Sequence, residues 1–283
     1  MLPRLHLGPF LGFVPTYLLT LSVAFVVAVA MTWYLARWTT GTGWWKPLVV
    51  ALAAAIPALP GARLLTRLVE PGGCPIEGAS DLWTAQGGLA FLGGVTLGTL
   101  GAWLACLLLR VPLLRFADAA TPSVLLADAI GRFGCLSAGC CYGRPTTGPF
   151  AVVFDGFDTP PRPVGVPLHP TQTYESVFAS GVAVVVLVLL ARRSIRDRPG
   201  LATAIGLAGY GIGRFAVEFL RADPRGGAAG LSTSQWLSIG VLALAAALFL
   251  HARRRTASLP PAIQGASPLD PAAAGRDPPQ SSA

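Results

Sequence analysis

Charged side chains are scarce in this chain of 283 residues. Only 12% of its residues are Asp, Glu, Lys or Arg, whereas hydrophobic residues make up 53%. A soluble domain carries about 25% charged residues, so the composition excludes an ordinary water-soluble fold. Apolar runs of about 20 residues are long enough to cross a bilayer as helices. The sequence therefore predicts a helical membrane protein.

Acidic residues are the rarer of the two charge types, with 13 Asp and Glu against 21 Lys and Arg, a net charge of +8. Such an excess often marks a surface that binds nucleic acid. Here the cations are scattered between apolar runs and do not gather on one face. We therefore expect no nucleic-acid partner and interpret the cations as determinants of membrane orientation.

Three further patterns are missing. There is no internal repeat, which argues against an inverted-repeat transporter. The five cysteines contain no C-x-x-C pair, which argues against a thiol oxidoreductase. The first apolar run is longer than a signal-peptide core and is not followed by a small-residue cleavage pattern. We expect it to remain in place as the first helix.

Seven apolar runs are present instead. They cover residues 10–36, 48–68, 87–109, 123–140, 171–191, 201–220 and 234–251. The sequence predicts an all-α bundle of about seven transmembrane spans within a single membrane domain, residues 1–255. Residues 256–283 are rich in Pro, Ala, Ser and Gly, so we expect a disordered tail.

Basic residues gather in alternate loops and predict the orientation of the bundle. One set of loops holds eleven cations against two acids, and the other holds seven cations against six acids. The first set consists of Arg37, Lys46, Arg110, Arg115, Arg192, Arg193, Arg196, Arg198 and Arg253 to Arg255, with Asp118 and Asp197 as its acids. The positive-inside rule makes this set cytoplasmic. The N-terminus then lies outside and the tail is cytoplasmic.

The first of three polar clusters at membrane depth lies in the fourth run. Asp128 and Arg132 are four residues apart, so they share a helix face and are expected to pair. Gly131 and Gly134 flank the arginine and leave room for a backbone or a lipid head group. Ionisable residues in a membrane indicate a functional site. The alternative is an arginine that extends from a helix end to the interface.

The second cluster opens the fifth run. Pro170 suits the first turn of a helix, which places His169 at the helix start with Gln172, Tyr174 and Glu175 on the following turns. The alternative is a capped helix that begins at the membrane interface, with the tyrosine in the aromatic belt.

The third cluster lies in the sixth run, where Arg214 and Glu218 form another i, i+4 pair, between Tyr210 and Arg221. A structural ion pair is the alternative here. Arginines at similar depth on two helices, Arg132 and Arg214, repel each other unless they share an anion. A lipid phosphate is the obvious anion in a membrane.

Taken in order, these clusters resemble the family of bacterial phosphatidylglycerol–prolipoprotein diacylglyceryl transferases. Five motifs keep the order and spacing of the family over about residues 8–250, and although each is weak alone, the series is specific. They are a glycine-rich stretch with Gly93 and Gly94, the Arg132 stretch with its turn at Gly143, the His169 segment, the Arg214 stretch, and Ser234-Gln235.

The resemblance implies a reaction in the bacterial inner membrane. A diacylglyceryl group passes from phosphatidylglycerol to the cysteine thiol of a preprolipoprotein lipobox, and glycerol phosphate leaves. No cofactor or metal is implied. The implied catalytic residues are Arg132, His169, Arg214 and Glu218. The implied substrate-binding residues are Gly93, Gly94, Gly131, Gly143, Gln172, Tyr174, Glu175, Tyr210 and Arg221.

The chemistry of the reaction fits these residues. Cations such as Arg132 and Arg214 would hold the phosphate and its developing charge. The acceptor thiol must become a thiolate, which requires a base or a strong positive field. His169 is the leading candidate base. Glu218 is the rival, but a carboxylate that pairs with an arginine is a poor proton acceptor. A third explanation is that no base is needed, because the positive field of the arginines alone lowers the pKa of the acceptor thiol.

Three positions depart from the family pattern. Leu92 stands where the family usually has His or Tyr, Cys135 replaces an asparagine, and Cys140 replaces a common acidic residue. A leucine neither donates nor accepts a proton. One alternative function is therefore a catalytically altered homologue that binds lipid or modifies another acceptor. A channel or transporter that uses the Arg/Glu pairs is another.

Four of the cysteines, Cys74, Cys135, Cys140 and Cys141, fall near the predicted outer face, and Cys106 lies within a span. They are either small buried residues or partners in a disulfide from Cys74 to Cys140 or Cys141. Sequence alone does not decide the connectivity.

Overall fold

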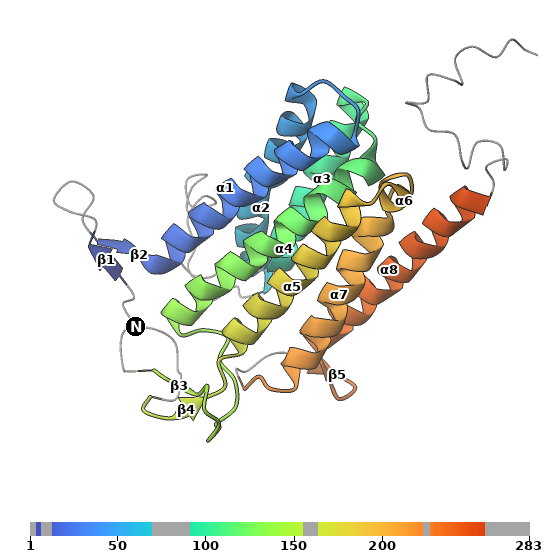
Figure 1. The fold of residues 1–283 in the computed structure, drawn as a ribbon. Helices are drawn as coiled ribbons and strands as arrows, with labels where there is room; N and C mark the ends of the chain where they lie inside the picture. The colour runs from blue at the N-terminus through green and yellow to red at the C-terminus, as the bar shows by residue number, and fades with distance from the viewer. Residues whose placement is uncertain (1–3, 7–12, 70–90, 155–163, 223–226, 258–283) are drawn as a thin grey trace, which may run out of the picture.

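The computed structural model describes residues 4–6, 13–69, 91–154, 164–222 and 227–257 (Figure 1). Helices dominate this part of the chain, as predicted. They are α1 (Thr16–Thr39), α2 (Trp45–Val69), α3 (Phe91–Leu109), α4 (Leu113–Ala138), α5 (Thr171–Ala191), the short α6 (Arg193–Arg196), α7 (Leu201–Glu218) and α8 (Thr233–Ala257). There are three small two-stranded antiparallel sheets, which pair β1 (Arg4–His6) with β2 (Phe13–Pro15), β3 (Val152–Val153) with β4 (Pro167–Leu168), and β5 (Gly227–Ala228) with β6 (Leu231–Ser232).

Each predicted apolar run corresponds to one long helix, although the boundaries differ. The largest difference is in α4, which begins at Leu113, ten residues before the predicted start at 123. The helix stops at Ala138 because Gly139 adopts a left-handed conformation with φ of 70°. The predicted tail, 256–283, overlaps the last turn of α8 and otherwise lies outside the described residues.

Four helices are long and apolar enough to cross a membrane: Thr16–Thr39, Trp45–Thr66, Thr171–Ala191 and Thr233–Arg254. The segment Gly93–Leu109 is a shorter apolar helix. The two other long helices, α4 and α7, carry charged residues in their interiors. Large apolar side chains point outward along the helices, as a lipid environment permits, among them Leu108 and Val177. These features identify a helical membrane protein.

The packing of the helices brings the three polar clusters together. Helix α1 packs on α4, α4 on α5, α5 on α7, and α7 on α8, and α4 also contacts α7 (Figure 1). Helices α2 and α3 form a close pair that contacts α1. Helices α4, α5 and α7, with the residues that flank them, therefore carry the three polar clusters.

Glycines allow α2 and α3 to approach closely. A Cβ atom at Gly61 would lie 2.8 Å from the Cβ of Leu97, and one at Gly94 would lie 3.0 Å from the carbonyl oxygen of Ala58. A Cβ at Gly93 would collide with the carbonyl of Gly61. The structure thus gives Gly93 and Gly94 a role in helix packing. Their role in substrate binding stays a prediction.

A buried carboxylate fixes the start of α7. Asp118 on α4 accepts hydrogen bonds from the backbone N–H of Gly200 at 2.7 Å and from the N–H and hydroxyl of Thr203, both at 2.8 Å. These are donors that the first turn of a helix leaves without intrahelical partners. The assignment of Asp118 to a loop was wrong, because the hydropathy pattern missed the first turns of α4. Arg63, one of the seven cations counted in the second set of loops, is buried in α2, so its assignment to a loop was also wrong.

Candidate functional site

Glu175 on α5 binds three arginines. Its Oε2 lies 2.6 Å from Nη1 of Arg132 on α4. Its Oε1 lies 2.9 Å from Nη1 of Arg214 on α7 and 3.3 Å from Nη1 of Arg221, which follows α7. All four side chains are at least 86% buried, since the most exposed, Arg132, has a relative accessibility of 14%. Residues from all three sequence clusters therefore meet at one carboxylate.

The two i, i+4 pairs predicted from the sequence are both present. Asp128 lies 3.3 Å from Arg132, and Glu218 lies 2.8 Å from Arg214. Glu218 also lies 3.8 Å from Nε of Arg221. Three carboxylates thus accompany three guanidinium groups, and the buried cluster (the arginine cluster below) is balanced in charge.

The conflict expected between the buried arginines is resolved by the protein itself. We expected Arg132 and Arg214 to need a shared anionic ligand, and the carboxylate of Glu175 takes that place. The other end of the Arg214 guanidinium donates from Nη2 to the hydroxyl of Ser234 at 2.8 Å. Sequence reasoning missed this contact, although Ser234 opens the last of the five motifs.

A narrow pocket adjoins the arginine cluster. It is lined by four residues of the cluster and five neighbours: Asp128, Arg132, Glu175 and Arg214, with Phe178, Ala179, Tyr210, Gly213 and Val217. A Cβ at Gly131 would meet no atom within 4 Å. This agrees with the prediction that Gly131 leaves room beside Arg132.

The turn after α4 is bonded to the start of α5 and to the end of α7. The N–H of Gly143 donates to the carbonyl of His169 at 3.0 Å, and the N–H of Arg144 donates to the carbonyl of Leu220 at 2.8 Å. A Cβ at Gly143 would lie 2.6 Å from the Cβ of His169 and 2.9 Å from the oxygen of Leu220. Gly143 therefore allows three segments to meet at the site.

His169 lies at the start of α5, as predicted, and its Nδ1 is 3.2 Å from the hydroxyl of Tyr174. Pro170 occupies the N-cap position. The ion-pair network of the described residues contains Arg132, Arg214 and Glu218 but not His169. The structure thus joins three of the four predicted catalytic residues in one network through Glu175.

Gln172 is buried, and its Nε2 donates to the carbonyl of Cys140 at 2.6 Å. The hydroxyl of Thr171 donates to the carbonyl of Cys141 at 2.6 Å. Both contacts hold the turn after α4 against the first turn of α5. They give Gln172 a structural role, and its role in substrate binding stays a prediction.

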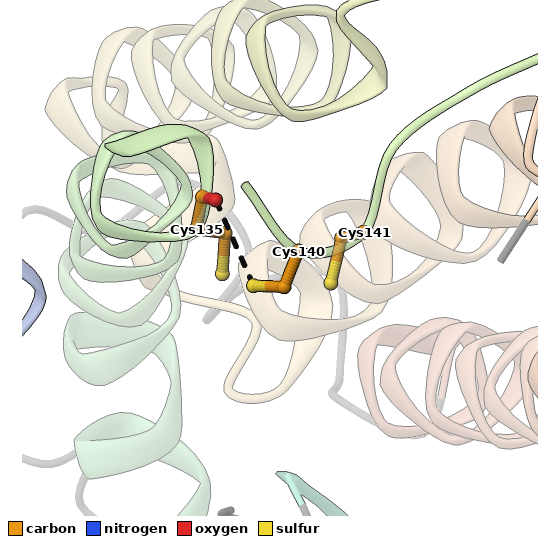
Figure 2. Close-up of side chains that lie close together, drawn as sticks. All are labelled: Cys135, Cys140 and Cys141. Carbon is orange, nitrogen blue, oxygen red and sulfur yellow. Dashed lines mark hydrogen bonds between the residues drawn. The ribbon is translucent and has the colours of Figure 1, made fainter. Parts of the chain in front are cut away.

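Three cysteines lie together at this turn. The sulfur atoms of Cys135, Cys140 and Cys141 are all within 4.8 Å of one another (Figure 2). Hydrogen bonds from the other two thiols, with the Arg221 guanidinium, lower the pKa of Cys141 against the opposing effect of burial. The pKa of Cys140 rises to about 11, because its bond to Cys135, which lowers the pKa, is outweighed by its bond to Cys141 and by burial.

The predictions on Cys106, Cys74 and Leu92 remain, and the structure describes the side chain of only the first. Cys106 is buried within α3, as a small core residue would be. The predicted disulfide involves Cys74, which lies outside the described residues, as does the side chain of Leu92.

The apolar helices and the buried arginine cluster define the class: a helical membrane protein with a network of ion pairs at its core. Residues 9–251 match the family model described as prolipoprotein diacylglyceryl transferase, and the chain belongs to that family. A phosphatidylglycerol–prolipoprotein diacylglyceryl transferase of Clostridium tetani is 36% identical over 190 residues, which cover 67% of this chain and 74% of that protein.

Two such transferases of Streptomyces coelicolor are also similar. The one numbered 2 is 34% identical over 256 residues, covering 88% of this chain and 79% of that protein. The one numbered 1 is 35% identical over 260 residues, covering 89% and 72%. The similarity therefore extends over nearly the whole chain and includes every helix that contributes to the arginine cluster.

Proposed function

We propose that this protein transfers the diacylglyceryl group of phosphatidylglycerol to the cysteine thiol of a prolipoprotein lipobox. Membership of the family supports the reaction. The observation that carries the proposal is the convergence of Arg132, Arg214 and Arg221 on Glu175 inside the helix group α4, α5 and α7. A site of this kind suits a reaction in which charge develops on a phosphate.

The arginines would stabilise the leaving group. As the acceptor thiolate attacks the glyceryl carbon, the carbon–oxygen bond to phosphate breaks and its electron pair stays on the phosphate. The phosphodiester, with one negative charge, becomes glycerol phosphate with two. Guanidinium groups already fixed in place stabilise this second charge without reorganisation. Arg132 and Arg214 take this role, and Glu175 holds them in position before the lipid binds.

His169 would accept the proton of the acceptor thiol. It lies just before α5, and its Nδ1 is 3.2 Å from the hydroxyl of Tyr174. Glu218 is less suited to this task, because its Oε2 already lies 2.8 Å from Arg214 and 3.8 Å from Arg221. Tyr174 and Gly143 lie beside the histidine.

The protein would lie in the cytoplasmic membrane of a bacterium as a bundle of seven spans. Phosphatidylglycerol would enter sideways from the bilayer, while the lipobox peptide would arrive at the outer surface. In this topology the turn after α4 faces outward and the cations from Arg192 to Arg198 face the cytoplasm. An alkaline phosphatase fusion within residues 143–169 should then be active, and one within 192–198 should be inactive. The reverse pattern would overturn the orientation.

Transfer is tested with the purified protein, labelled phosphatidylglycerol and a synthetic lipobox peptide. We expect label in the peptide, and none when serine replaces its cysteine. A folded protein that binds phosphatidylglycerol but leaves the peptide unlabelled would identify a catalytically altered homologue. Movement of lipid or solute across proteoliposomes without transfer would identify a transporter.

A further inference from the structure

The three cysteines at the end of α4 form a cluster that the transfer reaction does not use. Cys135 lies in the last turn of the helix, and Cys140 and Cys141 lie in the turn that follows (Figure 2). Each residue is half-buried, so the sulfur atoms are neither sealed in the core nor fully exposed. All three sulfur atoms lie within 4.8 Å of one another.

The backbone around the cluster is held in place by the rest of the site. Gly139 and Cys141 adopt left-handed conformations, with φ of 70° and 63°, and these reverse the chain towards Cys135. Side chains of α5 then bind the two carbonyls of the turn: Gln172 at Cys140 and Thr171 at Cys141, each at 2.6 Å. A left-handed conformation is uncommon for a residue other than glycine. The surrounding contacts stabilise it here.

We infer that Cys135, Cys140 and Cys141 bind a zinc ion through their three sulfur atoms. A zinc–sulfur bond is about 2.3 Å long, which places tetrahedral sulfur ligands roughly 3.8 Å apart. The sulfur atoms, within 4.8 Å of one another, have to close by no more than about 1 Å. Rotation of the cysteine side chains provides a movement of that size without a change in the backbone.

The ligand set selects the metal. Thiolates are soft ligands that favour zinc or copper(I), whereas magnesium and calcium require oxygen. Three thiolates with Zn²⁺ leave one negative charge, and with Cu⁺ they leave two. Because uncompensated charge is costly in a partly buried site, the smaller excess of negative charge favours zinc.

Neither of the simpler explanations requires three sulfur atoms to converge. A disulfide joins two cysteines and does not explain why the third sulfur atom lies beside them. A cysteine that only fills space in the core, such as the buried Cys106 on α3, has no need to point its sulfur atom at other cysteines. Among the described residues, no other His, Cys, Asp or Glu joins the group. The fourth position of a tetrahedral zinc ion is then taken by water.

A zinc ion at this position would join the end of α4 to the turn that carries Gly143. That turn is bonded to His169 before α5 and to Leu220 after α7. The metal would therefore stiffen the end of the site at which the predicted base lies. The inference does not depend on transferase activity, because metal binding is measured in the absence of lipid.

The test uses the full chain in detergent, reduced and stripped of metal, and titrates it with zinc chloride against a chromophoric chelator. We expect one zinc ion per chain. The variants Cys135→Ser and Cys140→Ser should each lower the zinc affinity at least tenfold. Cys106→Ser is the matched control and should bind zinc like the wild type. Cobalt(II) in place of zinc should produce sulfur-to-metal charge-transfer absorption in the wild type.

Alkylation of the wild-type protein provides a measurement that needs no variant to fold. Zinc should protect Cys135, Cys140 and Cys141 from iodoacetamide and leave the labelling of Cys106 unchanged. The inference is overturned if the reduced protein binds no zinc at micromolar concentration. It is equally overturned if both serine variants bind zinc like the wild type, or if zinc leaves the labelling of the three cysteines unchanged.

Discussion

Two buried carboxylates stand at opposite ends of α4, α5 and α7, and they bind different kinds of donor. Asp118 accepts three hydrogen bonds from neutral groups at the start of α7. Glu175 binds the guanidinium groups of three arginines. On α4, Asp118 and Arg132 are 14 residues apart, or about 21 Å along the helix axis. The same helices therefore carry two buried anionic sites that are well separated.

The type of donor distinguishes a carboxylate that holds the fold together from one that holds arginines in position for a ligand. The neutral donors around Asp118 belong to the backbone and one hydroxyl of α7, and they cannot move to another anion without unwinding the helix start. The three cations around Glu175 are side chains, so they can share their hydrogen bonds with an incoming phosphate. We propose that Asp118 stabilises the fold and that the cluster around Glu175 recognises the lipid.

Replacement of His169 should have the largest effect, because it is the proposed base for the acceptor thiol. We expect His169→Gln to lower transfer about 100-fold to 10,000-fold, the usual contribution of a general base. Leu92→His in that background should restore part of the activity, because it returns a proton acceptor to the position where the family has one. Transfer of labelled diacylglyceryl to the peptide measures both. Robust transfer by His169→Gln would mean that the field of the arginines suffices.

Replacement of the arginines should rank next. Arg132→Ala and Arg214→Ala should each lower transfer by at least ~100-fold, the effect of losing one preorganised charge-stabilising contact. Lysine at either position should restore activity only partly, because an ammonium group cannot make the planar bidentate contact. Arg193→Ala, on the exposed α6, is the matched control and should transfer normally. Full activity of a well-folded Arg214→Ala protein would reduce its pairing with Glu218 to a structural role.

Asp118→Asn should separate stability from activity. The change removes the charge and replaces one acceptor oxygen by a donor that faces other donors, which costs about 1–3 kcal/mol. We expect a lower thermal unfolding temperature in detergent and transfer per folded molecule within a few-fold of the wild type. A loss of transfer comparable with that of Arg214→Ala would erase the distinction between the two carboxylates.

The smallest effect is expected at Gly94. A Cβ there would lie 3.0 Å from the carbonyl oxygen of Ala58, so α2 and α3 would have to separate slightly. Gly94→Ala should lower stability by about 1 kcal/mol, the lower end of the cost of overpacking, and leave transfer per folded molecule unchanged. A selective rise in the KM for phosphatidylglycerol would instead support the substrate-binding role predicted for this glycine.

The sequence predicted the parts of the fold that depend on local patterns. Each apolar run became a helix, and the pairs Asp128–Arg132 and Arg214–Glu218 formed because residues four apart share a helix face. The start of α4 was missed because Arg115 and Asp118 interrupt its hydropathy. Asp118 bonds to residues more than 80 positions away, and a window of neighbouring residues contains no signal of such a contact.

The sequence indicated which residues gather at the candidate site better than it indicated how they are arranged. Glu175 was predicted to bind substrate, and this stays a prediction. Its position among three arginines could not be predicted, because it depends on how α4, α5 and α7 pack. One signal in the sequence could have indicated this arrangement. Glu175 is an acidic residue in an apolar helix, and the two other clusters each contain an arginine that needs an anionic partner. The convergence of Cys135 with Cys140 was missed for a different reason. It depends on the left-handed conformation of Gly139, which propensity alone does not specify.

The central claim is that the arginine cluster binds the phosphate of the donor lipid. Thermal unfolding of the purified protein with phosphatidylglycerol, and separately with diacylglycerol, tests it directly, because the two lipids differ by the phosphate and its glycerol. Phosphatidylglycerol should stabilise the wild type and the Arg193→Ala control but not the doubly substituted Arg132→Ala/Arg214→Ala protein, and diacylglycerol should stabilise none of them. Equal stabilisation of the wild type and the double variant by phosphatidylglycerol would contradict the claim.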